Sequence, residues 1–377
     1  MRIGIEAQRL FRPHKHGMDV VALELIRAIQ RTDTQNEYFI FVKPDTDHKC
    51  LQDTDNVKIV EIPGSNYALW EQVQLPRFAH KYKLDVLHCT ANTAPFFCDV
   101  PLVLTLHDVI FLEKKERKSS SSAYQRYGNM YRSWIVPHVT KKATQVVTVS
   151  NYEKGQITAQ LPLREDKISV VYNGLSTYFR RPSTPAQEAL VKQRYHLPAQ
   201  FLFFLGNTDP RKNLTNVLEA FSKLAEKEEN IELVIGSLSE QNIENELIKL
   251  NLLHLRRRIR CIGYVPDFLL PIIYKQAEVF LYPSLHEGFG LPILEAMSCG
   301  TPVVTSTSTA MPEVAGDAAF LVNPYDVNDI LRGLEEALIH NTLRSSKVTA
   351  GLQRVNQFSW DTSARQMQEI YQSIASL

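Results

Sequence analysis

Two glutamates bracket a glycine-rich stretch late in the chain, HEGFGLPILEAMSCG. Pro292 suits the first position of a helix and Gly300 the position just past its end, so we expect Glu295 in the first turn of a short helix. The N–H groups and dipole at such a helix start favour a phosphate. Glu287 and Glu295 are then suited to accept hydrogen bonds from the hydroxyls of a sugar or ribose. The alternative is a tight turn with two solvated glutamates.

A basic pair follows a predicted strand in the middle of the chain. The strand is Phe201–Leu205, and GNTDPRKN comes directly after it. Gly206 allows close approach of a ligand, and Asn213 is suited to cap the next helix. Arg211 offers bidentate contacts to phosphate and Lys212 a point charge, which makes this turn a candidate phosphate site. The alternative is a solvated basic turn.

Further candidates follow predicted strands in the first half of the chain. Gly17 lies between the first strand and a helix, where its N–H can face a ligand. His107 ends an apolar strand in the sequence LTLHD, and Asp108 could orient it. Asn173 could bond a ligand or make a turn, whereas for Ser150 we favour a cap.

Residues 114–142 form a strongly basic segment, with eight Lys or Arg and one acid, Glu116. Tyrosines and a tryptophan recur at helical spacing in its second part. Basic residues beside such aromatics fit an anionic membrane surface or a lipid phosphate, and a solvated helix with its aromatics in the core is the alternative. The acceptor or membrane side is accordingly assigned to Lys114, Lys115, Arg126, Arg132 and Trp134.

Short apolar runs that read as strands alternate with amphipathic helical stretches along the whole chain. Continuous apolar strands are typical of parallel sheets covered on both faces. The pattern predicts an α/β protein with two doubly wound, Rossmann-like domains whose ligands lie in the cleft at the carboxyl ends of the strands. The predicted divisions are a domain at 1–178, a linker at 179–200, a domain at 201–357 and a closing helix at 358–377.

Composition excludes several classes of protein. The chain has 377 residues, 44% hydrophobic and 22% charged, which is globular rather than disordered or fibrous. A net charge of +1 argues against a nucleic-acid partner. The five cysteines have no CxxC spacing, as expected for a reduced, cytoplasmic protein. Neither a signal peptide nor a membrane-spanning run is apparent, so we expect a soluble protein, at most peripheral on the inner face of the cytoplasmic membrane.

These residues resemble a retaining glycosyltransferase of family 4, with the GT-B fold, a family that includes bacterial mannosyl- and glucosyltransferases. The resemblance covers nearly the whole chain. Its most specific feature is the pair of glutamates in EGFGLPILE, Glu287 and Glu295, joined by the basic pair in GNTDPRKN, a histidine at His107 and a closing helix. Many relatives have two glycines in the loop after the first strand, whereas this chain has HGMDVVA, with one glycine and Asp19.

The resemblance also implies roles for individual residues. Arg211 and Lys212 are expected to hold the donor diphosphate, Glu295 the ribose, and Glu287 the donor sugar near the reacting carbon. His107 is expected to contact the sugar or to stabilise charge in the transition state. The remaining donor-side residues are expected to contribute mainly backbone groups: Gly288, Phe289, Gly290, Leu291, Gly206, Asn173 and Gly17.

The leading hypothesis is a hexosyltransferase that moves mannose from GDP-mannose to a glycan or lipid-linked acceptor. No cofactor and no metal are expected, because the family needs none and the DxD strings at 45–47 and 53–55 are interpreted as surface turns. A UDP sugar is an alternative donor. The alternative functions are a sugar-nucleotide epimerase on the same fold and an inactive nucleotide-sugar-binding protein.

Overall fold

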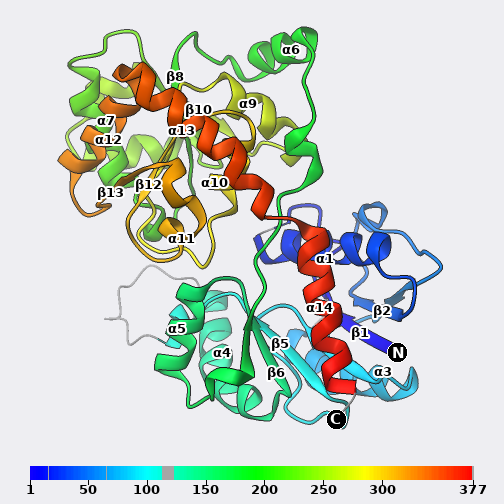
Figure 1. The fold of residues 1–377 in the computed structure, drawn as a ribbon. Coiled ribbons are helices and arrows are strands. Elements are labelled where there is room, and N and C mark those ends of the chain that lie inside the picture. The colour runs from blue at the N-terminus through cyan, green and yellow to red at the C-terminus, as the bar shows by residue number, and fades with distance from the viewer. Residues whose placement is uncertain (16, 65, 113–122, 376–377) are drawn as a thin grey trace. The chain divides into compact units, whose positions relative to one another are not determined.

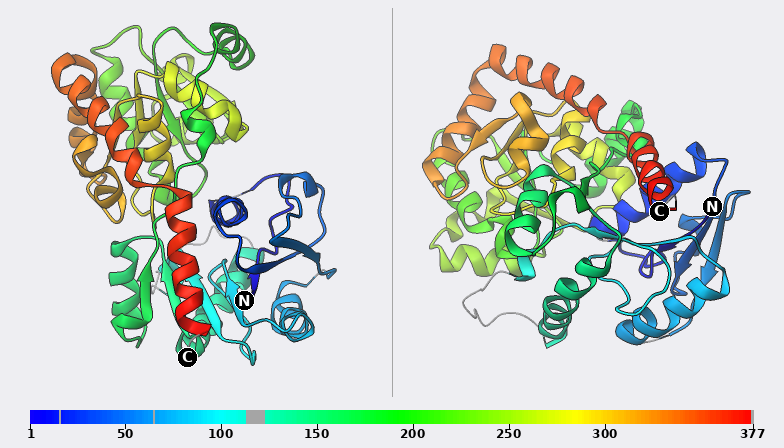
Figure 2. Two further views of the ribbon diagram at one scale, coloured as in Figure 1. Left: turned by 45° about the vertical axis from the view of Figure 1, so that its right-hand side comes forward. Right: turned by 60° about the horizontal axis from the view of Figure 1, so that its bottom comes forward.

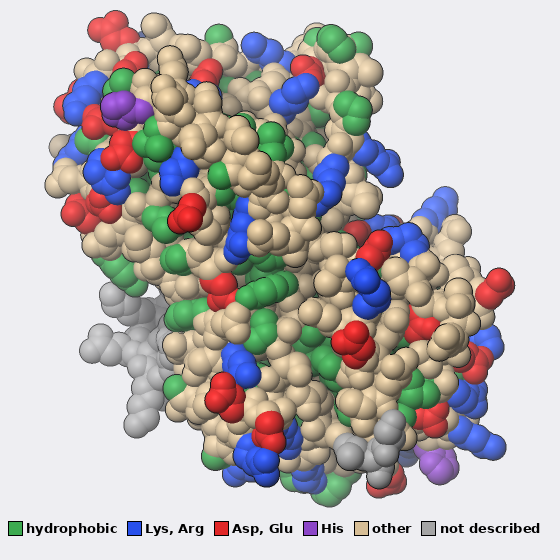
Figure 3. Space-filling view, in the orientation of Figure 1, with side chains coloured by type: hydrophobic (Ala, Val, Ile, Leu, Met, Phe, Trp, Pro, Cys, Tyr) green, Lys and Arg blue, Asp and Glu red, His purple; other side chains and the backbone are tan. Residues whose placement is uncertain are grey.

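The computed structural model describes residues 1–15, 17–64, 66–112 and 123–375. They divide into two compact units (Figure 1). Unit 1 comprises Met1–Gly174 and Ser359–Leu377, and unit 2 comprises Leu175–Phe358. On the face drawn in Figure 3, basic and acidic side chains are interspersed, in keeping with the net charge of +1.

Unit 1 is built on a parallel seven-stranded sheet in the order β3-β2-β1-β4-β5-β6-β7. Its strands are β1 (Arg2–Glu6), β2 (Glu37–Val42), β3 (Val57–Glu61), β4 (Val86–Cys89), β5 (Leu102–Leu106), β6 (Gln145–Thr148) and β7 (Ile168–Val170). Its helices are α1 (Gly17–Thr32), α2 (Tyr67–Leu69), a π-helical turn (Trp70–Gln74), α3 (Leu75–Lys81), α4 (Ala123–Lys142), α5 (Asn151–Gln160) and α14 (Trp360–Ala375). The inner strands are almost wholly buried, as their apolar sequences predict, whereas the edge strand β3 exposes Lys58 and Glu61.

Helix α14, although last in the chain, packs into the core of unit 1 beside α1 (Figures 1 and 2). One face of α14 is buried at helical spacing, by Trp360, Ala364, Met367, Tyr371 and Ile374. The Tyr371 hydroxyl bonds His88 Nδ1 at 2.7 Å, and His88 Nε2 bonds the Thr105 hydroxyl at 2.7 Å. Burial lowers the pKa of His88 to about 3, so a neutral histidine joins α14 to the central strands.

Unit 2 is built on a parallel six-stranded sheet in the order β10-β9-β8-β11-β12-β13. Its strands are β8 (Phe201–Leu205), β9 (Glu232–Gly236), β10 (Ile259–Gly263), β11 (Val279–Tyr282), β12 (Val303–Ser306) and β13 (Phe320–Val322). Its helices are α6 (Pro185–Tyr195), α7 (Leu214–Ala225), α8 (Glu240–Lys249), α9 (Leu270–Gln276), α10 (Leu291–Ser298), α11 (Met311–Ala315), α12 (Val327–Ile339) and α13 (Asn341–Arg354).

The linker predicted at 179–200 is instead grouped with unit 2. Thr184 and Gln187 form a capping box that starts α6, and Pro185 occupies a first-turn position where its missing N–H is harmless. Val191 is 2% exposed, and Glu188 pairs with Lys275 of α9 at 2.6 Å. The prolines that suggested a linker therefore begin a helix that packs on its own domain.

Gly174, at the boundary of the two units, allows a close approach of two backbone segments. A Cβ there would lie 2.1 Å from the backbone nitrogen of Trp360 and 2.6 Å from the carbonyl carbon of Ser359. Because these are backbone atoms, they cannot move aside as a flexible side chain would.

We expect Gly174→Ala to destabilise unit 1 by at least about 2 kcal/mol, because the overpacked start of α14 must shift. Urea unfolding followed by circular dichroism measures this. Gly155→Ala is the matched control, since a Cβ at this exposed helical glycine meets nothing within 4 Å. The control should be neutral or stabilise by about 0.5–1 kcal/mol. Equal midpoints for the two variants would contradict the assigned contact.

Candidate active site

The strand order of unit 2 brings two distant loops together. Strand β8 pairs with β9 on one side and with β11 on the other, so the direction of winding reverses between β8 and β11. In doubly wound sheets, ligands bind at such a reversal, outside the carboxyl ends of the strands. The loops that follow these two strands are the basic turn and the glycine-rich stretch, which sequence reasoning had selected separately.

Lys212, Tyr282 and Glu287 form a closed hydrogen-bonded triangle at this point. Lys212 Nζ donates to Glu287 Oε1 at 2.6 Å and to the Tyr282 hydroxyl at 2.8 Å. The Tyr282 hydroxyl donates to the same Glu287 oxygen at 2.8 Å. Burial by itself would lower the pKa of Lys212, but Tyr282 and Glu287 outweigh burial and raise it. The ammonium is therefore a fixed cation in a site whose side chains are about one-fifth exposed.

Two of the three ammonium donors of Lys212 are used in the triangle, and Glu287 Oε2 has no hydrogen bond within the described residues. A cation with a spare donor thus lies beside a carboxylate with a spare acceptor. Such a pair suits a ligand that carries both a phosphate and hydroxyl groups.

Arg211 is oriented by the turn to which it belongs. Asp209 accepts from Arg211 Nε at 2.9 Å and from a terminal guanidinium nitrogen at 2.7 Å. Asn213 has φ of 64° and does not cap α7 with its side chain, contrary to the sequence prediction. Its amide instead donates to the carbonyls of Pro283 and Pro324, at 2.9 and 2.7 Å. The amide therefore ties the loops after β8, β11 and β13 to one another.

Glu295 lies in the second turn of α10 rather than in the first, because the helix begins at Leu291. Its Oε2 accepts from the Tyr274 hydroxyl at 3.0 Å. Burial raises the pKa of Glu295 to about 8, the Tyr274 hydrogen bond opposes the shift, and Asp267 adds to it.

We expect Glu295→Gln to make stability less dependent on pH. A carboxyl whose pKa rises from 4.5 to about 8 on folding contributes stability at low pH that is lost as pH rises through this window. The variant should therefore gain on the wild type by about 3–4 kcal/mol between about pH 5 and pH 8.5. Urea unfolding at both pH values measures this, with exposed Glu226→Gln as control. A parallel pH dependence of variant and wild type would refute the shift.

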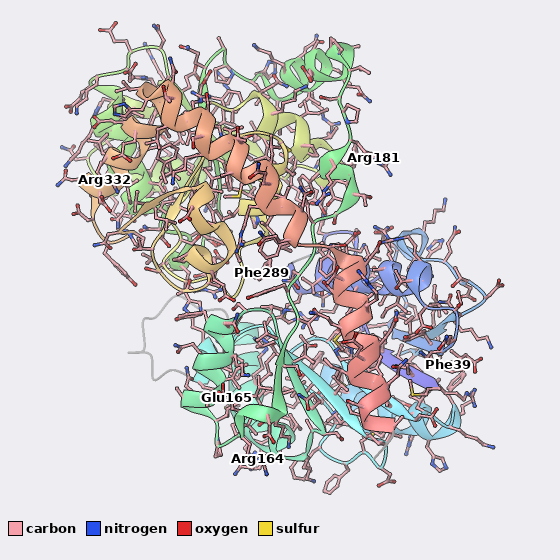
Figure 4. The ribbon with its side chains drawn as sticks, viewed as in Figure 1. Phe39, Arg164, Glu165, Arg181, Phe289 and Arg332 are labelled. Carbon is pink, nitrogen blue, oxygen red and sulfur yellow. The ribbon has the colours of Figure 1, made fainter. Side chains whose placement is uncertain are left out.

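The glycine-rich stretch places its backbone at the start of α10. Gly290 has φ of 100°, in the left-handed region that favours glycine, and it precedes the first helical residue, Leu291. Gly288 is not among the residues of positive φ. The Phe289 ring, labelled in Figure 4, is 5% exposed and packs edge-on against Phe358 at 5.8 Å. Phe289 therefore fixes the loop through its side chain. Gly206 follows β8 directly.

In unit 1, His107 follows β5 and is 8% exposed. Its Nε2 donates to the Thr90 carbonyl at 2.8 Å, and its backbone N–H donates to Asn92 Oδ1 at 2.7 Å. Asp108 was predicted to orient the imidazole, but Thr90 does so. Burial lowers the pKa of His107, although the Thr90 bond and the charges of Asp108 and Asp19 oppose the shift. The ring is thus held neutral, with Nδ1 as its acceptor.

The other candidates of unit 1 differ in burial and in role. Asn173 is 5% exposed and lines, with His107, a cavity of about 30 Å³ that has room for an ordered water. Gly17 begins α1 and is exposed. Ser150 caps α5 by accepting from the Glu153 N–H, as predicted.

The basic segment is described only in part. Lys114 and Lys115 lie outside the described residues, and Arg126 belongs to α4 without a described side chain. Tyr131 turns inward and donates to Glu71 Oε1 at 2.5 Å, whereas Trp134 is 58% exposed. Arg132 bonds Asn129 on the surface. Tyr131 is therefore oriented as the alternative interpretation expects and Trp134 is not, and the membrane interpretation stays a prediction.

The DxD strings lie in the connection between β2 and β3. Asp47 pairs with Lys15, and Asp53 accepts from the Ile59 N–H at 2.8 Å. Asp45, Asp53 and Asp55 are exposed. Across the described residues, no group of three or more His, Cys, Asp or Glu side chains is arranged to hold a metal ion. Nor is any described helix both long and apolar enough to cross a bilayer.

Sequence reasoning missed three partners of the predicted residues: Tyr282, Tyr274 and Asp209. Tyr282 and Tyr274 are buried aromatics in apolar segments and read as core. Their hydroxyls are what matters, since a buried phenol requires a partner. The position of Tyr282 at the last residue of β11 was the available signal.

Comparison with known proteins finds glycosyltransferase families along most of the chain. Residues 16–179 match the family described as Glycosyltransferase Family 4, and residues 187–353 match the one described as Glycosyl transferases group 1. O-antigen chain mannosyltransferase B of Escherichia coli is 35% identical over 233 residues, which are 61% of this chain and 60% of that protein. The serotype-specific mannosyltransferase WbdA of Escherichia coli is 28% identical over 70% of this chain and 32% of its own length. The matched region thus spans less than two thirds of either relative.

Solved structures extend the likeness to the whole chain. A sucrose-phosphate synthase from Thermosynechococcus elongatus superposes with a TM-score of 0.76 at 18% identity, covering 100% of this chain and 99% of that one. Anabaena HepE in complex with UDP-glucose has a TM-score of 0.74 at 18% identity, covering 99% and 100%. These likenesses concern the fold alone and confirm the predicted class, two Rossmann-like domains of the GT-B type.

Proposed function

Since this chain belongs to the family 4 and group 1 glycosyltransferases, we propose that it is a hexosyltransferase acting on a nucleotide diphosphate sugar. The observation that carries the proposal is the Lys212–Tyr282–Glu287 triangle at the winding reversal of unit 2. Arg211 and Lys212 supply cations for a diphosphate, and Glu287 Oε2 supplies an acceptor for a sugar hydroxyl. Glu295, on the helix that follows, is assigned to the ribose.

The proposed donor is GDP-mannose. Its support is that the E. coli relatives described above are named as mannosyltransferases. A UDP sugar is the alternative donor. Those names favour sugar transfer over the epimerase and the inactive binding protein. The proposed acceptor is a glycan or a lipid-linked glycan, which would place the enzyme peripherally on the inner face of the cytoplasmic membrane.

The proposed reaction retains the anomeric configuration and needs no metal. The diphosphate leaves as the sugar–oxygen bond breaks, and Arg211 and Lys212 stabilise the charge that develops on it. Glu287 lies beside Lys212, where it can hold the sugar and balance positive charge at the anomeric carbon. His107, neutral and with Nδ1 as an acceptor, is proposed to contact the sugar from unit 1.

The test is incubation with GDP-mannose or UDP-glucose and a panel of soluble mannose-containing glycans, in the presence and absence of EDTA. Released nucleoside diphosphate and glycan mass are measured, and NMR assigns the anomer. GDP release coupled to an α-linked product that is insensitive to EDTA is expected. Epimerised donor without transfer would favour the epimerase, and donor binding without turnover would favour the inactive protein. A β-linked product or inhibition by EDTA would refute retention or metal independence respectively.

A further inference from the structure

Unit 1 carries an exposed aromatic surface on one flank of α4. It is formed by Phe96, Phe97, Met130, Trp134, His138 and Lys142, and we refer to it as the aromatic face. Phe97 is 75% exposed, Met130 65% and Trp134 58%. Large apolar side chains that are exposed together mark an interaction site more often than single ones do.

The rings of the aromatic face form one connected cluster. The Phe96 ring lies 4.7 Å from that of Phe97 and 6.2 Å from that of Trp134, which in turn lies 5.3 Å from His138. Met130, Trp134 and His138 recur every four residues on α4, and Ile135, Val136 and Val139 bury the opposite side. The core therefore fixes the direction in which the aromatic face points.

Lys142 places a cation against two of these rings. Lys142 Nζ lies 3.7 Å from the Phe96 ring centroid and 4.8 Å from that of Phe97, and it donates to the Phe96 carbonyl at 3.1 Å. Lys142 also lines a cavity of about 290 Å³ whose other lining residues include Asp99 and Thr144. Lys141 is exposed beside it. Lys141 and Lys142 are thus two exposed cations beside the apolar centre, and Asp99 is an exposed acid in the cavity lining.

The aromatic face extends to the amino ends of the strands in unit 1. Leu102 begins β5, Thr144 precedes β6, and both line the cavity. His107 follows the opposite end of β5. A partner seated at the cavity therefore leaves the carboxyl edge of the sheet, with His107, to the sugar.

We propose that the aromatic face docks on an anionic lipid bilayer, with Phe97 and Trp134 among the acyl chains and Lys142 at the lipid phosphates. Aromatic and methionine side chains beside exposed lysines match the boundary between acyl chains and headgroups, and the lysines match anionic lipid. This docking surface rests on the proposed function, because a lipid-linked acceptor requires the enzyme to reach a membrane.

The test uses the full chain with phosphatidylcholine vesicles, with and without phosphatidylglycerol. Of the three tryptophans, Trp70 is 1% exposed and Trp360 5%, so a change in emission reports on Trp134. Emission should shift to shorter wavelength and be quenched by brominated lipid, with the anionic vesicles only. High salt should weaken binding, because the charges are exposed.

The variant Phe97→Ser/Trp134→Ser should lower the vesicle-bound fraction in flotation by at least about tenfold. Leu190→Ser, at a 65% exposed position on α6 of unit 2, is the matched control and should leave it unchanged. Equal flotation of the double variant and the wild type, or equal binding to neutral and anionic vesicles, would overturn the proposal. Light scattering measures self-association of the chain. If the wild type associates and the double variant does not, the aromatic face binds a second copy of the chain instead.

Nucleotide binding and transfer to a soluble glycan, measured without vesicles, separate this proposal from the proposed function. Both should be retained by the double variant, which also shows that it folds. Loss of vesicle binding with transfer retained supports the docking surface. Vesicle binding without any transfer by the wild type would instead refute the proposed function and leave the docking surface standing.

Discussion

Replacing Lys212 by methionine is expected to lower kcat for sugar transfer by about 10³-fold and to weaken binding of the nucleoside diphosphate. The ammonium is held by Glu287 at 2.6 Å and by the Tyr282 hydroxyl at 2.8 Å, and its raised pKa keeps it charged. Its position is therefore set before the ligand arrives. A preorganised cation stabilises a leaving diphosphate more strongly than a mobile one, because no reorganisation is needed as the charge develops.

Initial rates and calorimetry with GDP and UDP measure this effect. The pair Lys227–Glu335, at 2.5 Å on the surface of unit 2, provides the control. Lys227→Met removes a lysine from a similar ion pair far more exposed to solvent, and it should change neither the rate nor the affinity. Diphosphate affinity in Lys212→Met equal to that of the wild type would remove Lys212 from the phosphate site.

Much of the fold was predictable because both sheets are parallel and buried. The strand predicted at Phe201–Leu205 appears in the structure with the same bounds, as β8. Helix α13 was missed because its sequence is mostly polar and only Gly351 is buried in it. That glycine packs close to Met297 of α10, a contact that the local sequence pattern does not predict.

The parts of the candidate site were predictable singly, but their assembly was not. A strand followed by GNTDPRKN and another followed by HEGFGLP each indicate a ligand loop. That β8 lies beside β11, rather than beside β10, depends on strand order, which arises from the packing of whole helices on the sheet. The Tyr282 hydroxyl meets Lys212 only through that assembly, and the Tyr274 hydroxyl of α9 meets Glu295 only because α9 packs against α10.

We expect Glu287→Gln to lower kcat by about 10²–10³-fold while leaving the donor KM within a few fold of the wild type. In the wild type, Glu287 Oε1 accepts from both Lys212 and Tyr282, and Oε2 has no partner within the described residues. The amide keeps the shape of the side chain but loses the negative charge and one acceptor. If that charge balances a sugar that turns cationic as the diphosphate leaves, its loss affects the transition state more than the bound donor.

Glu295→Gln should show the opposite split, a higher donor KM with a smaller change in kcat, because a ribose contact is alike in the ground and transition states. Glu335→Gln, which removes the carboxylate of the surface pair with Lys227, is the control and should change neither constant. If Glu287→Gln raised KM and Glu295→Gln lowered kcat, the two carboxylates would exchange roles. If Glu287→Gln altered neither constant, the triangle around Lys212 would be a structural feature that only positions the lysine.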